Sequence, residues 1–401
     1  MKHRIFINMH YMALGGAERA LLGLLNAFDS ERVDVDLFLN QHTGEFMQLL
    51  PNHINLLPAR RGYNAIERPM KTILIEGQLK ILYGRLKAKC LHGKYHRSLK
   101  EPHKSFDASG FQYVADCVSP YLEPLDDLGE YDLAISFLQP HNIVLNKVKA
   151  KKKIAWIHTD YSTIHINAEK ELKIWGKFDY IASISPDCAS SFLKIFPSLK
   201  DKIIEIENIL SPDFVRKQAD LFDVTSEISS SSLNLVSVGR FCNAKNYDNV
   251  PDIARRVIEK GYPDLRWYLI GFGGDETLIR HKIVEAGMED HVIILGKKDN
   301  PYPYIKACDI YVQPSRYEGK SVTVREAQIL YKPVITTEYP TAKSQIQDGV
   351  DGIIVPMDNE GCAKGIANAI NNSELLHSIT KYLTTHDYGN ESEVNKIYHI
   401  I

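Results

Sequence analysis

Two glutamates separated by seven residues, Glu318 and Glu326, lie on either side of the start of an apolar segment. Gly319 allows a sharp turn after the first glutamate, and a helix is expected to follow. The first N–H groups of a helix have no partner inside it and can bind a phosphate. Glu318 would then accept hydrogen bonds from hydroxyls of a neutral ligand such as a sugar. Glu326, two turns further on, would reach another part of that ligand. The solvated face of an ordinary amphipathic helix carries such pairs too.

Four predicted strands, each followed by a loop, lead up to the region of Glu318. Their loops contain glycines and charged residues, which are expected at one edge of the sheet. The four segments span Leu233–Val238, Leu265–Ile270, 291–296 and 307–315. Arg240 comes two residues after the first strand, and Lys245 five residues later. Ligands of open parallel sheets bind at the carboxyl ends of the strands, and a diphosphate needs compact positive charge. Arg240 and Lys245 are therefore the best phosphate candidates, with ordinary surface cations as the alternative.

The first part of the chain begins with a β-α-β pattern, in which Gly15 and Gly16 precede a predicted helix. These glycines either form a structural turn or allow a phosphate or acceptor to approach the backbone closely. His158 follows a predicted strand at 153–157, so it is expected at the carboxyl edge of the sheet. Asp160 would orient His158 or cap a helix, and His10, at the end of the first strand, is a weaker candidate.

Length and composition set limits on the function. The 401 residues are enough for two α/β domains, and a net charge of −2 argues against a nucleic-acid binder. No apolar run has the length of a membrane span, and the N-terminal apolar stretch is too short for a secretion signal. The six cysteines are scattered without a C-x-x-C pair, which favours reduced thiols in the cytoplasm over disulfides or a zinc site.

The predicted organisation is an N-terminal domain at 1–209, a C-terminal domain at 210–385 and a last helix at 386–401. The segment 60–104 departs from this pattern, because it contains twelve Lys or Arg against three Glu, with apolar residues between them. A basic amphipathic helix of this kind is suited to an anionic membrane surface. The alternative is the solvated face of an ordinary helical insertion.

A series of short motifs, each loose alone, occurs in a specific order and spacing. They are Val238-Gly239-Arg240 with Lys245, Ile270-Gly271-x-Gly273, Leu295-Gly296, Asp309-Ile310-x-Val312-x-Pro314-Ser315, Glu318-Gly319-x6-Glu326-Ala327 and Lys332-Pro333-Val334-Ile335. In this order the sequence resembles the retaining glycosyltransferases of family 4, of the bacterial surface-polysaccharide type. The resemblance covers nearly the whole chain and is strongest at 238–356. It implies the GT-B fold, an α/β architecture in which two Rossmann-like domains with parallel sheets face each other across a cleft.

The resemblance also assigns roles to residues. Arg240 and Lys245 would contact the diphosphate of the donor and stabilise the charge that grows on it. Glu318 would contact the donor sugar, as would His158, and Glu326 would lie near the ribose of the nucleotide.

The turn before the helix completes the implied nucleotide-sugar site. Gly319, Lys320, Ser321 and Val322 would form it, with backbone N–H groups at the helix start, and Gly15 and Gly16 would approach from the first domain. Lys320 and Ser321 depart from the common pattern of an aromatic or aliphatic residue followed by Gly or Pro, so the donor sugar stays open.

The implied activity is transfer of a hexosyl group from a nucleotide diphosphate sugar, with UDP as the expected carrier, to a hydroxyl of a glycan or lipid-linked acceptor. We expect no cofactor and no metal, because Arg, Lys and helix N-termini would take the role that a metal cation has in other enzymes. A cytoplasmic protein, peripheral at the inner face of the membrane if the basic segment binds there, would suit polysaccharide assembly. The alternatives are a non-catalytic sugar-nucleotide-binding subunit and a GT-B nucleotide-sugar epimerase.

Overall fold

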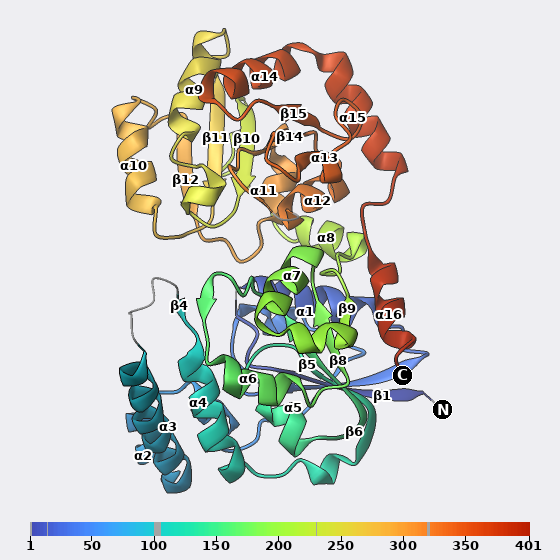
Figure 1. Cartoon of the computed structure of the whole chain (residues 1–401). Helices are drawn as coiled ribbons and strands as arrows, with labels where there is room; N and C mark the ends of the chain where they lie inside the picture. The colour runs from blue at the N-terminus through green and yellow to red at the C-terminus, as the bar shows by residue number, and fades with distance from the viewer. Residues whose placement is uncertain (1, 14, 100–105, 230, 319–320) are drawn as a thin grey trace. The chain divides into compact units, whose positions relative to one another are not determined.

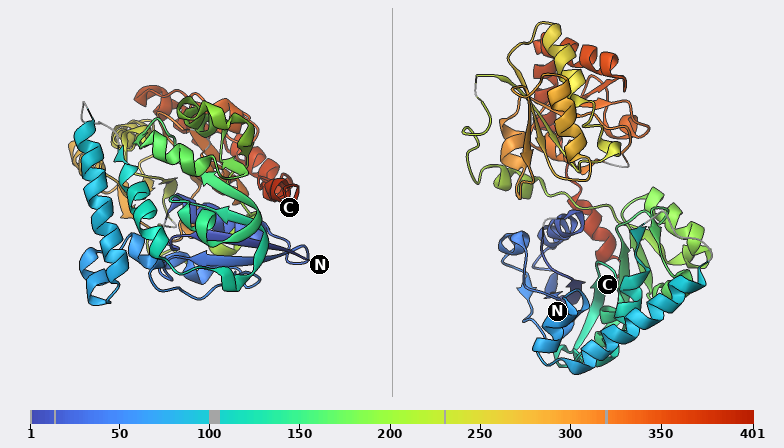
Figure 2. Two further views of the ribbon diagram at one scale, coloured as in Figure 1. Left: turned by 60° about the horizontal axis from the view of Figure 1, so that its bottom comes forward. Right: turned by 90° about the vertical axis from the view of Figure 1, so that its left-hand side faces the viewer.

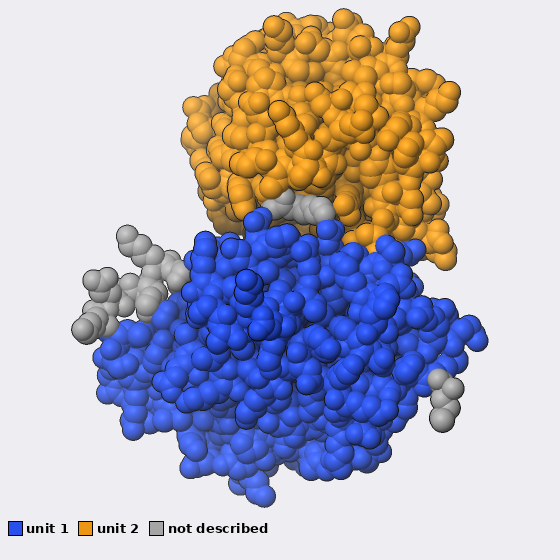
Figure 3. All heavy atoms as spheres, turned by 45° about the vertical axis from the view of Figure 1, so that its right-hand side comes forward, with its two compact units in different colours: residues 1–209, 391–401 blue, residues 210–390 orange. Residues whose placement is uncertain are grey.

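The computed structural model describes residues 2–13, 15–99, 106–229, 231–318 and 321–401. The chain forms two compact units (Figure 3). The first consists of Met1–Ile209 together with Glu391–Ile401, and the second of Leu210–Asn390.

The first unit is built on a seven-stranded parallel sheet with the strand order β3-β2-β1-β5-β6-β8-β9 (Figure 1). The strands are β1 His3–Met9, β2 Val33–Leu39, β3 Asn55–Leu56, β5 Glu130–Ser136, β6 Lys149–Ile157, β8 Tyr180–Ser183 and β9 Ile203–Glu205. The helices are α1 Gly16–Ala27, α2 Met70–Ile75, α3 Leu79–Ser98, α4 Ser109–Val118, α5 Asn142–Lys147, α6 Ala168–Trp175 and α7 Pro186–Ile195. The strand order changes direction between β1 and β5, which is where ligands of open parallel sheets bind.

The second unit has a six-stranded parallel sheet with the order β12-β11-β10-β13-β14-β15, the doubly wound order of dinucleotide-binding folds. The strands are β10 Leu233–Val238, β11 Leu265–Ile270, β12 Val292–Gly296, β13 Ile310–Gln313, β14 Val334–Thr337 and β15 Ile353–Val355. The helices are α8 Pro212–Ala219, α9 Val250–Glu259, α10 Glu276–Glu285, α11 Tyr302–Ala307, α12 Val322–Ile329, α13 Ala342–Gln345, α14 Asn359–Asn371 and α15 Ser373–Thr385.

Both faces of the second sheet are covered, as a parallel sheet requires. Along β10, Leu235 packs into one hydrophobic cluster with residues of α9, α10 and α14. Its neighbour Val236 packs into a second cluster with residues of α8, α11 and α12. Adjacent side chains of a strand point to opposite faces, so the continuous apolar run of β10 fixes helices on both sides.

The end of the chain belongs to the first unit. The short helix α16 (Asn395–Tyr398) carries Tyr398, whose hydroxyl accepts a hydrogen bond from the Asp29 N–H at 2.8 Å. The guanidinium of Arg32 lies 3.9 Å from the centre of the same ring. The final segment predicted at 386–401 is thus partly extended, and only 391–401 groups with the first unit.

The basic insertion is helical, but its apolar side chains are not confined to one face as its composition suggests. Ile73, Ile81 and Ala88 are buried against the unit. A second set of apolar side chains on α2 and α3 is exposed, and Ile75 keeps 75 % of its surface. The two helices therefore have apolar residues on both their packed and their free faces. In the ribbon views, α2 and α3 lie at the edge of the first unit, and α3 packs beside α4 (Figure 2). None of the described helices combines the length and the apolar character of a membrane span.

Candidate functional site

The carboxyl ends of β10, β11 and β12 are joined closely by backbone hydrogen bonds. The Gly239 N–H donates to Ile270 O at 3.0 Å, and the Gly271 N–H donates to Gly296 O at 2.9 Å. Gly271 has a φ of +147°, and a Cβ at this position would lie 1.9 Å from Gly239 O. Only glycine allows the two strand ends to approach so closely. The glycines predicted at this edge of the sheet thus allow the strand ends to approach one another at the base of the candidate site.

Glu318 lies beyond the end of β13 and is held by three donors that all bind one carboxylate oxygen. Its Oε1 accepts hydrogen bonds from Lys245 Nζ at 2.6 Å, Ser315 Oγ at 2.6 Å and Gln313 Nε2 at 2.9 Å. Glu318 is 9 % exposed, and its Oε2 accepts no hydrogen bond from the residues that the structure describes. The carboxylate therefore has a fixed orientation and one oxygen left to accept hydrogen bonds from a ligand.

Lys245 reaches Glu318 across the point where the strand order reverses. It ends a short 3₁₀ turn, and Asn246, which follows in the left-handed conformation, donates to Pro314 O at 2.9 Å. This bond fastens the turn after β10 to the end of β13. The stem of Lys245 passes over Gly239, where an added Cβ would lie 3.1 Å from Lys245 Cε. The structure thus brings together Lys245 and Glu318, which the sequence predicts as parts of one site.

Arg240 differs from its neighbours because its charge is not used inside the protein. The side chain is exposed, and its guanidinium makes no hydrogen bond or ion pair with any described residue. The nearby Arg316, in contrast, binds both carboxylate oxygens of Asp248 at 2.8 Å. Arg240 is consequently a cation at this sheet edge that is free to bind an anion.

The start of α12 follows Glu318, although the predicted residues Gly319 and Lys320 lie outside the described part of the chain. Ser321 is the residue before the helix, and its N–H donates to Gln345 Oε1 at 3.0 Å. In return Gln345 Nε2 donates to Ser321 O at 2.5 Å. Val322 begins the helix, so its N–H belongs to the first turn, whose donors lack intrahelical partners. Gln345 is a residue of this site that no sequence motif indicates.

Glu326 is fully buried on α12 and accepts a hydrogen bond from the Tyr302 hydroxyl at 2.8 Å. In this structure the carboxylate has no surface that a ligand could touch. Contact between Glu326 and a ribose therefore stays a prediction that requires the side chains around Glu326 to move.

In the first unit, His158 is half-buried beside two aromatic rings. The centre of its imidazole ring lies 4.5 Å from the centre of the Phe137 ring. The imidazole is also stacked against the Trp156 ring, with the two ring centres 6.1 Å apart. Burial lowers the pKa of His158 to about 3, so the imidazole is neutral at physiological pH. Its Nε2 is buried and has no partner among the described residues. Asp160 accepts instead from the Ser162 N–H at 2.8 Å, which makes it a local turn residue.

At the end of β1 the buried His10 pairs with the partly buried Glu67. His10 Nδ1 is 2.5 Å from Glu67 Oε1, and neither His10 Nε2 nor Glu67 Oε2 has a described partner. Glu67 also lines a cavity of about 990 Å³ that extends from the end of β1 to α3 and α4. From its position in the sequence, His10 is a weaker candidate than His158. No sequence pattern indicates Glu67, because 57 residues separate it from His10.

Gly15 and Gly16 lie at the start of α1, as predicted. The Glu18 carboxylate folds back over Gly15, so that an added Cβ would lie 2.1 Å from Glu18 Oε2. A carboxylate is stabilised at a helix N-terminus, so the protein supplies its own anion here. An approach of the donor to Gly15 or Gly16 stays a prediction.

The buried histidine His141 provides a pH test of this part of the fold. Burial, together with His10 and His158, lowers its pKa from 6.5 to about 3. Below pH 6.5 the unfolded chain therefore binds a proton that the folded protein does not, and the free energy of unfolding falls as the pH is lowered. His141→Asn should reduce the loss of stability between pH 7.0 and 5.5 by roughly 1 kcal/mol, measured by urea denaturation. The exposed His377→Asn is the control, and equal pH dependence of all three proteins would refute the burial argument.

Known proteins resemble this chain in sequence and in fold. Residues 222–386 match the family described as glycosyl transferases group 1. An uncharacterized glycosyltransferase of Haemophilus influenzae is 23 % identical over 249 residues, which are 61 % of this chain and 68 % of that protein. The N-acetylgalactosamine-N,N'-diacetylbacillosaminyl-diphospho-undecaprenol 4-alpha-N-acetylgalactosaminyltransferase of Campylobacter jejuni is 28 % identical over 31 % of this chain and 34 % of its own length.

A solved structure with the same fold is Anabaena Alr3699/HepE in complex with UDP and glucose. It superposes with a TM-score of 0.65 at 15 % identity and covers 99 % of this chain and 98 % of its own. The chain therefore has the predicted GT-B fold, which consists of two Rossmann-like units. Residues 222–386, which lie within the second unit, are therefore similar to the glycosyl transferases group 1 family, and both relatives named above are glycosyltransferases.

Proposed function

We propose that this protein is a retaining glycosyltransferase of family 4. It transfers a hexosyl group from a nucleoside diphosphate sugar, with UDP as the first choice of carrier, to a hydroxyl of a glycan or lipid-linked acceptor in polysaccharide biosynthesis. The observation that carries the proposal is Glu318, which is fixed by Lys245 and has one free oxygen. The unpaired Arg240 follows β10, the strand next to β13, which precedes Glu318. UDP and glucose in Alr3699/HepE and the diphospho-undecaprenol acceptor in the name of the Campylobacter enzyme support the choice of substrates.

The proposed chemistry follows from the charges at the site. The diphosphate binds Arg240, Lys245 and the N-terminal end of α12, where positive charge and helix N–H groups favour an anion. As the bond between the anomeric carbon and the diphosphate oxygen breaks, negative charge grows on the leaving group, and the same cations stabilise it. No metal is needed in this scheme. Glu318 Oε2 accepts a hydrogen bond from a sugar hydroxyl and orients the ring.

The acceptor proton needs a destination. In the proposed front-face mechanism, the departing diphosphate oxygen takes the proton from the acceptor hydroxyl. The acceptor oxygen then bonds to the anomeric carbon on the face from which the diphosphate leaves, so the anomeric configuration is retained.

The cavity of the first unit suits an amphiphilic acceptor. Its wall includes Met70, Phe111 and Val114 together with Arg68 and Lys89. Apolar side chains beside cations can hold a molecule with a hydrocarbon part and an anionic group. We therefore assign acceptor binding to this cavity.

We also propose that the free face of α2 and α3 binds an anionic membrane surface. Exposed apolar side chains alternate there with exposed cations; they are Leu74, Ile75, Leu79, Tyr83 and Leu86 with Lys71, Lys80 and Lys87. Apolar groups that enter the interface and Lys residues that meet anionic headgroups act together.

A vesicle flotation assay tests this surface. Wild-type protein should float with vesicles that contain anionic lipid at low salt, and the variant Ile75→Ser/Leu79→Ser should bind at least about tenfold less, because each lost side chain contributes about 1.5 kcal/mol. Leu278→Ser on α10, where the side chain is 46 % exposed, is the matched control and should bind as wild type. Wild-type protein that stays at the bottom of the gradient would remove the membrane proposal.

The activity itself is tested by incubating the protein with nucleoside diphosphate sugars and candidate acceptors and measuring the released nucleoside diphosphate. Release that depends on the acceptor, with a product of unchanged anomeric configuration by NMR, is the expected result. Donor consumption without an acceptor would indicate an epimerase. Donor binding without any turnover would indicate a non-catalytic subunit.

A further inference from the structure

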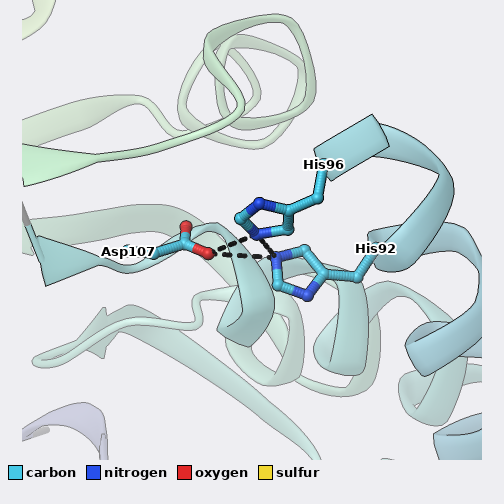
Figure 4. Close-up of side chains that lie close together, drawn as sticks. All are labelled: His92, His96 and Asp107. Atoms are coloured by element: carbon cyan, nitrogen blue, oxygen red, sulfur yellow. Dashed lines mark hydrogen bonds and ion pairs between the residues drawn. The ribbon is translucent and has the colours of Figure 1, made fainter. Parts of the chain in front are cut away.

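Three side chains of the first unit converge at the end of α3 (Figure 4). His92 and His96 come from this helix, and Asp107 comes from the short strand β4 (Phe106–Asp107). His96 Nε2 lies 2.6 Å from Asp107 Oδ2, His92 Nε2 lies 3.0 Å from His96 Nε2, and His92 Nε2 lies 3.3 Å from Asp107 Oδ2. One nitrogen or oxygen of each side chain therefore meets the others at a single point.

The backbone holds these side chains in this arrangement. His92 and His96 are four residues apart and so lie on one face of the helix. Their rings are nearly perpendicular, at 81°, with both Nε2 atoms aimed at the carboxylate (Figure 4). β4 pairs with β7 (Ile164–His165), and the Ala108 N–H donates to His165 O at 2.8 Å, which fixes the strand that carries Asp107.

Asp107 is itself oriented by a neighbour. Its Oδ1 accepts hydrogen bonds from the Ser109 N–H at 3.0 Å and the Ser109 hydroxyl at 2.6 Å. This leaves Oδ2 directed at the two histidines. Carboxylates and imidazoles that bind metals are usually held by such outer partners.

Hydrogen bonding accounts for only part of this cluster. His96 Nε2–H can donate to Asp107 Oδ2, and His92 Nε2–H can donate to Ser109 Oγ at 2.9 Å. The two Nε2 atoms, 3.0 Å apart, would then both carry a hydrogen, so this contact is not satisfied by a hydrogen bond. A cation at the centre would accept a lone pair from all three atoms at once. Tetrahedral zinc with ligands at about 2.1 Å separates its donor atoms by ~3.4 Å, so small movements of partly exposed side chains would fit the ion.

We propose that His92, His96 and Asp107 form a binding site for a divalent transition metal, with zinc as the preferred ion. Two imidazoles and one carboxylate are ligands that zinc, nickel, cobalt and copper accept, and three protein ligands leave a position open to water or a substrate oxygen. His92 and Asp107 also line the cavity of about 990 Å³, so the bound ion stands at its wall.

The site shares no residue with the proposed diphosphate site, because all three of its ligands belong to the first unit. The spacing of the cysteines predicts no zinc site in this chain. That criterion cannot detect a metal site whose ligands are only histidine and aspartate. The sequence signal is the pair of histidines at i and i+4 in a predicted helix. Nothing in the sequence connects this pair with Asp107 across the intervening residues.

Calorimetric titration of the chelator-treated protein with zinc chloride at pH 7.5 tests the proposal. We expect one equivalent to bind to the wild type, and cobalt to produce visible absorption bands of a tetrahedral ion. His92→Gln, His96→Gln and Asp107→Asn should each abolish stoichiometric binding, while circular dichroism confirms that each variant is folded. Ser109→Ala should weaken binding about 10- to 100-fold, because it removes the partner that orients the carboxylate.

The control is His281→Gln in the second unit, an exposed histidine that also has a carboxylate, Glu285, four residues away. It should bind zinc as the wild type does. Wild-type protein that takes up no equivalent of zinc, or ligand variants that bind as well as the wild type, would overturn the proposal.

Discussion

Arg240→Ala is expected to lower the rate of sugar transfer at least about a hundredfold and to leave the free energy of unfolding within about 0.5 kcal/mol of wild type. The separation of the two effects follows from the structure, because the Arg240 side chain is exposed and makes no hydrogen bond or ion pair with any described residue. Its loss removes nothing from the folded protein but takes a charge from the diphosphate.

The comparison for this experiment is Arg266→Ala. Arg266 is also exposed, but it stands near the start of β11, at the amino end of the same sheet. Its replacement should not change the rate. Equal rates for the Arg240 variant and the wild type would remove Arg240 from the site, and equal losses in both variants would point to a general charge effect.

Glu318→Gln is expected to lower both activity and stability. The change keeps the shape of the side chain but removes its charge, which leaves Lys245, with 19 % of its side chain exposed, without an ionised partner. We expect a loss of about 1–3 kcal/mol in the free energy of unfolding and at least about a hundredfold in the rate of transfer. Denaturant unfolding and the release of nucleoside diphosphate measure the two effects.

A double-mutant cycle separates the roles of this pair. Adding Lys245→Met to Glu318→Gln removes the uncompensated cation, so stability should recover in part, whereas the rate should fall further. Glu259→Gln, which breaks an exposed pair with Arg255 on α9, is the control and should cost less than about 1 kcal/mol. Recovery of activity together with stability would show that the Lys245–Glu318 pair acts on the fold alone.

The sequence predicts the fold well because its signals are local. The strands at Leu233–Val238 and Leu265–Ile270 are short apolar runs that end in glycine, and the structure has strands at these positions. Helix α8 was not predicted, because its polar sequence resembles a linker. Its buried residues, such as Val215, pack against a sheet that only the folded chain provides.

The candidate site is predicted in part. Lys245 and Glu318 are close together as expected, whereas their supports Ser315 and Gln313 are polar residues without a distinctive pattern. The burial of Glu326 depends on Tyr302, which approaches it only through tertiary packing.

The surface of the basic insertion shows the same limit. Its composition indicates one apolar face, but the free row of side chains around Ile75 and Leu79 becomes visible only when the packed row is known. The pairing of His10 with Glu67 likewise joins segments that the sequence keeps apart.

Calorimetric titration with matched nucleotides tests most directly whether the second unit binds a diphosphate through its two cations. The affinity for UDP is compared with that for UMP first. The comparisons of GDP with GMP and of ADP with AMP follow. For one base, the diphosphate should bind at least about tenfold more tightly than the monophosphate, and this advantage should disappear in Arg240→Ala/Lys245→Met. Equal affinity for monophosphate and diphosphate with every base, or an advantage that survives in the double variant, would contradict the assignment.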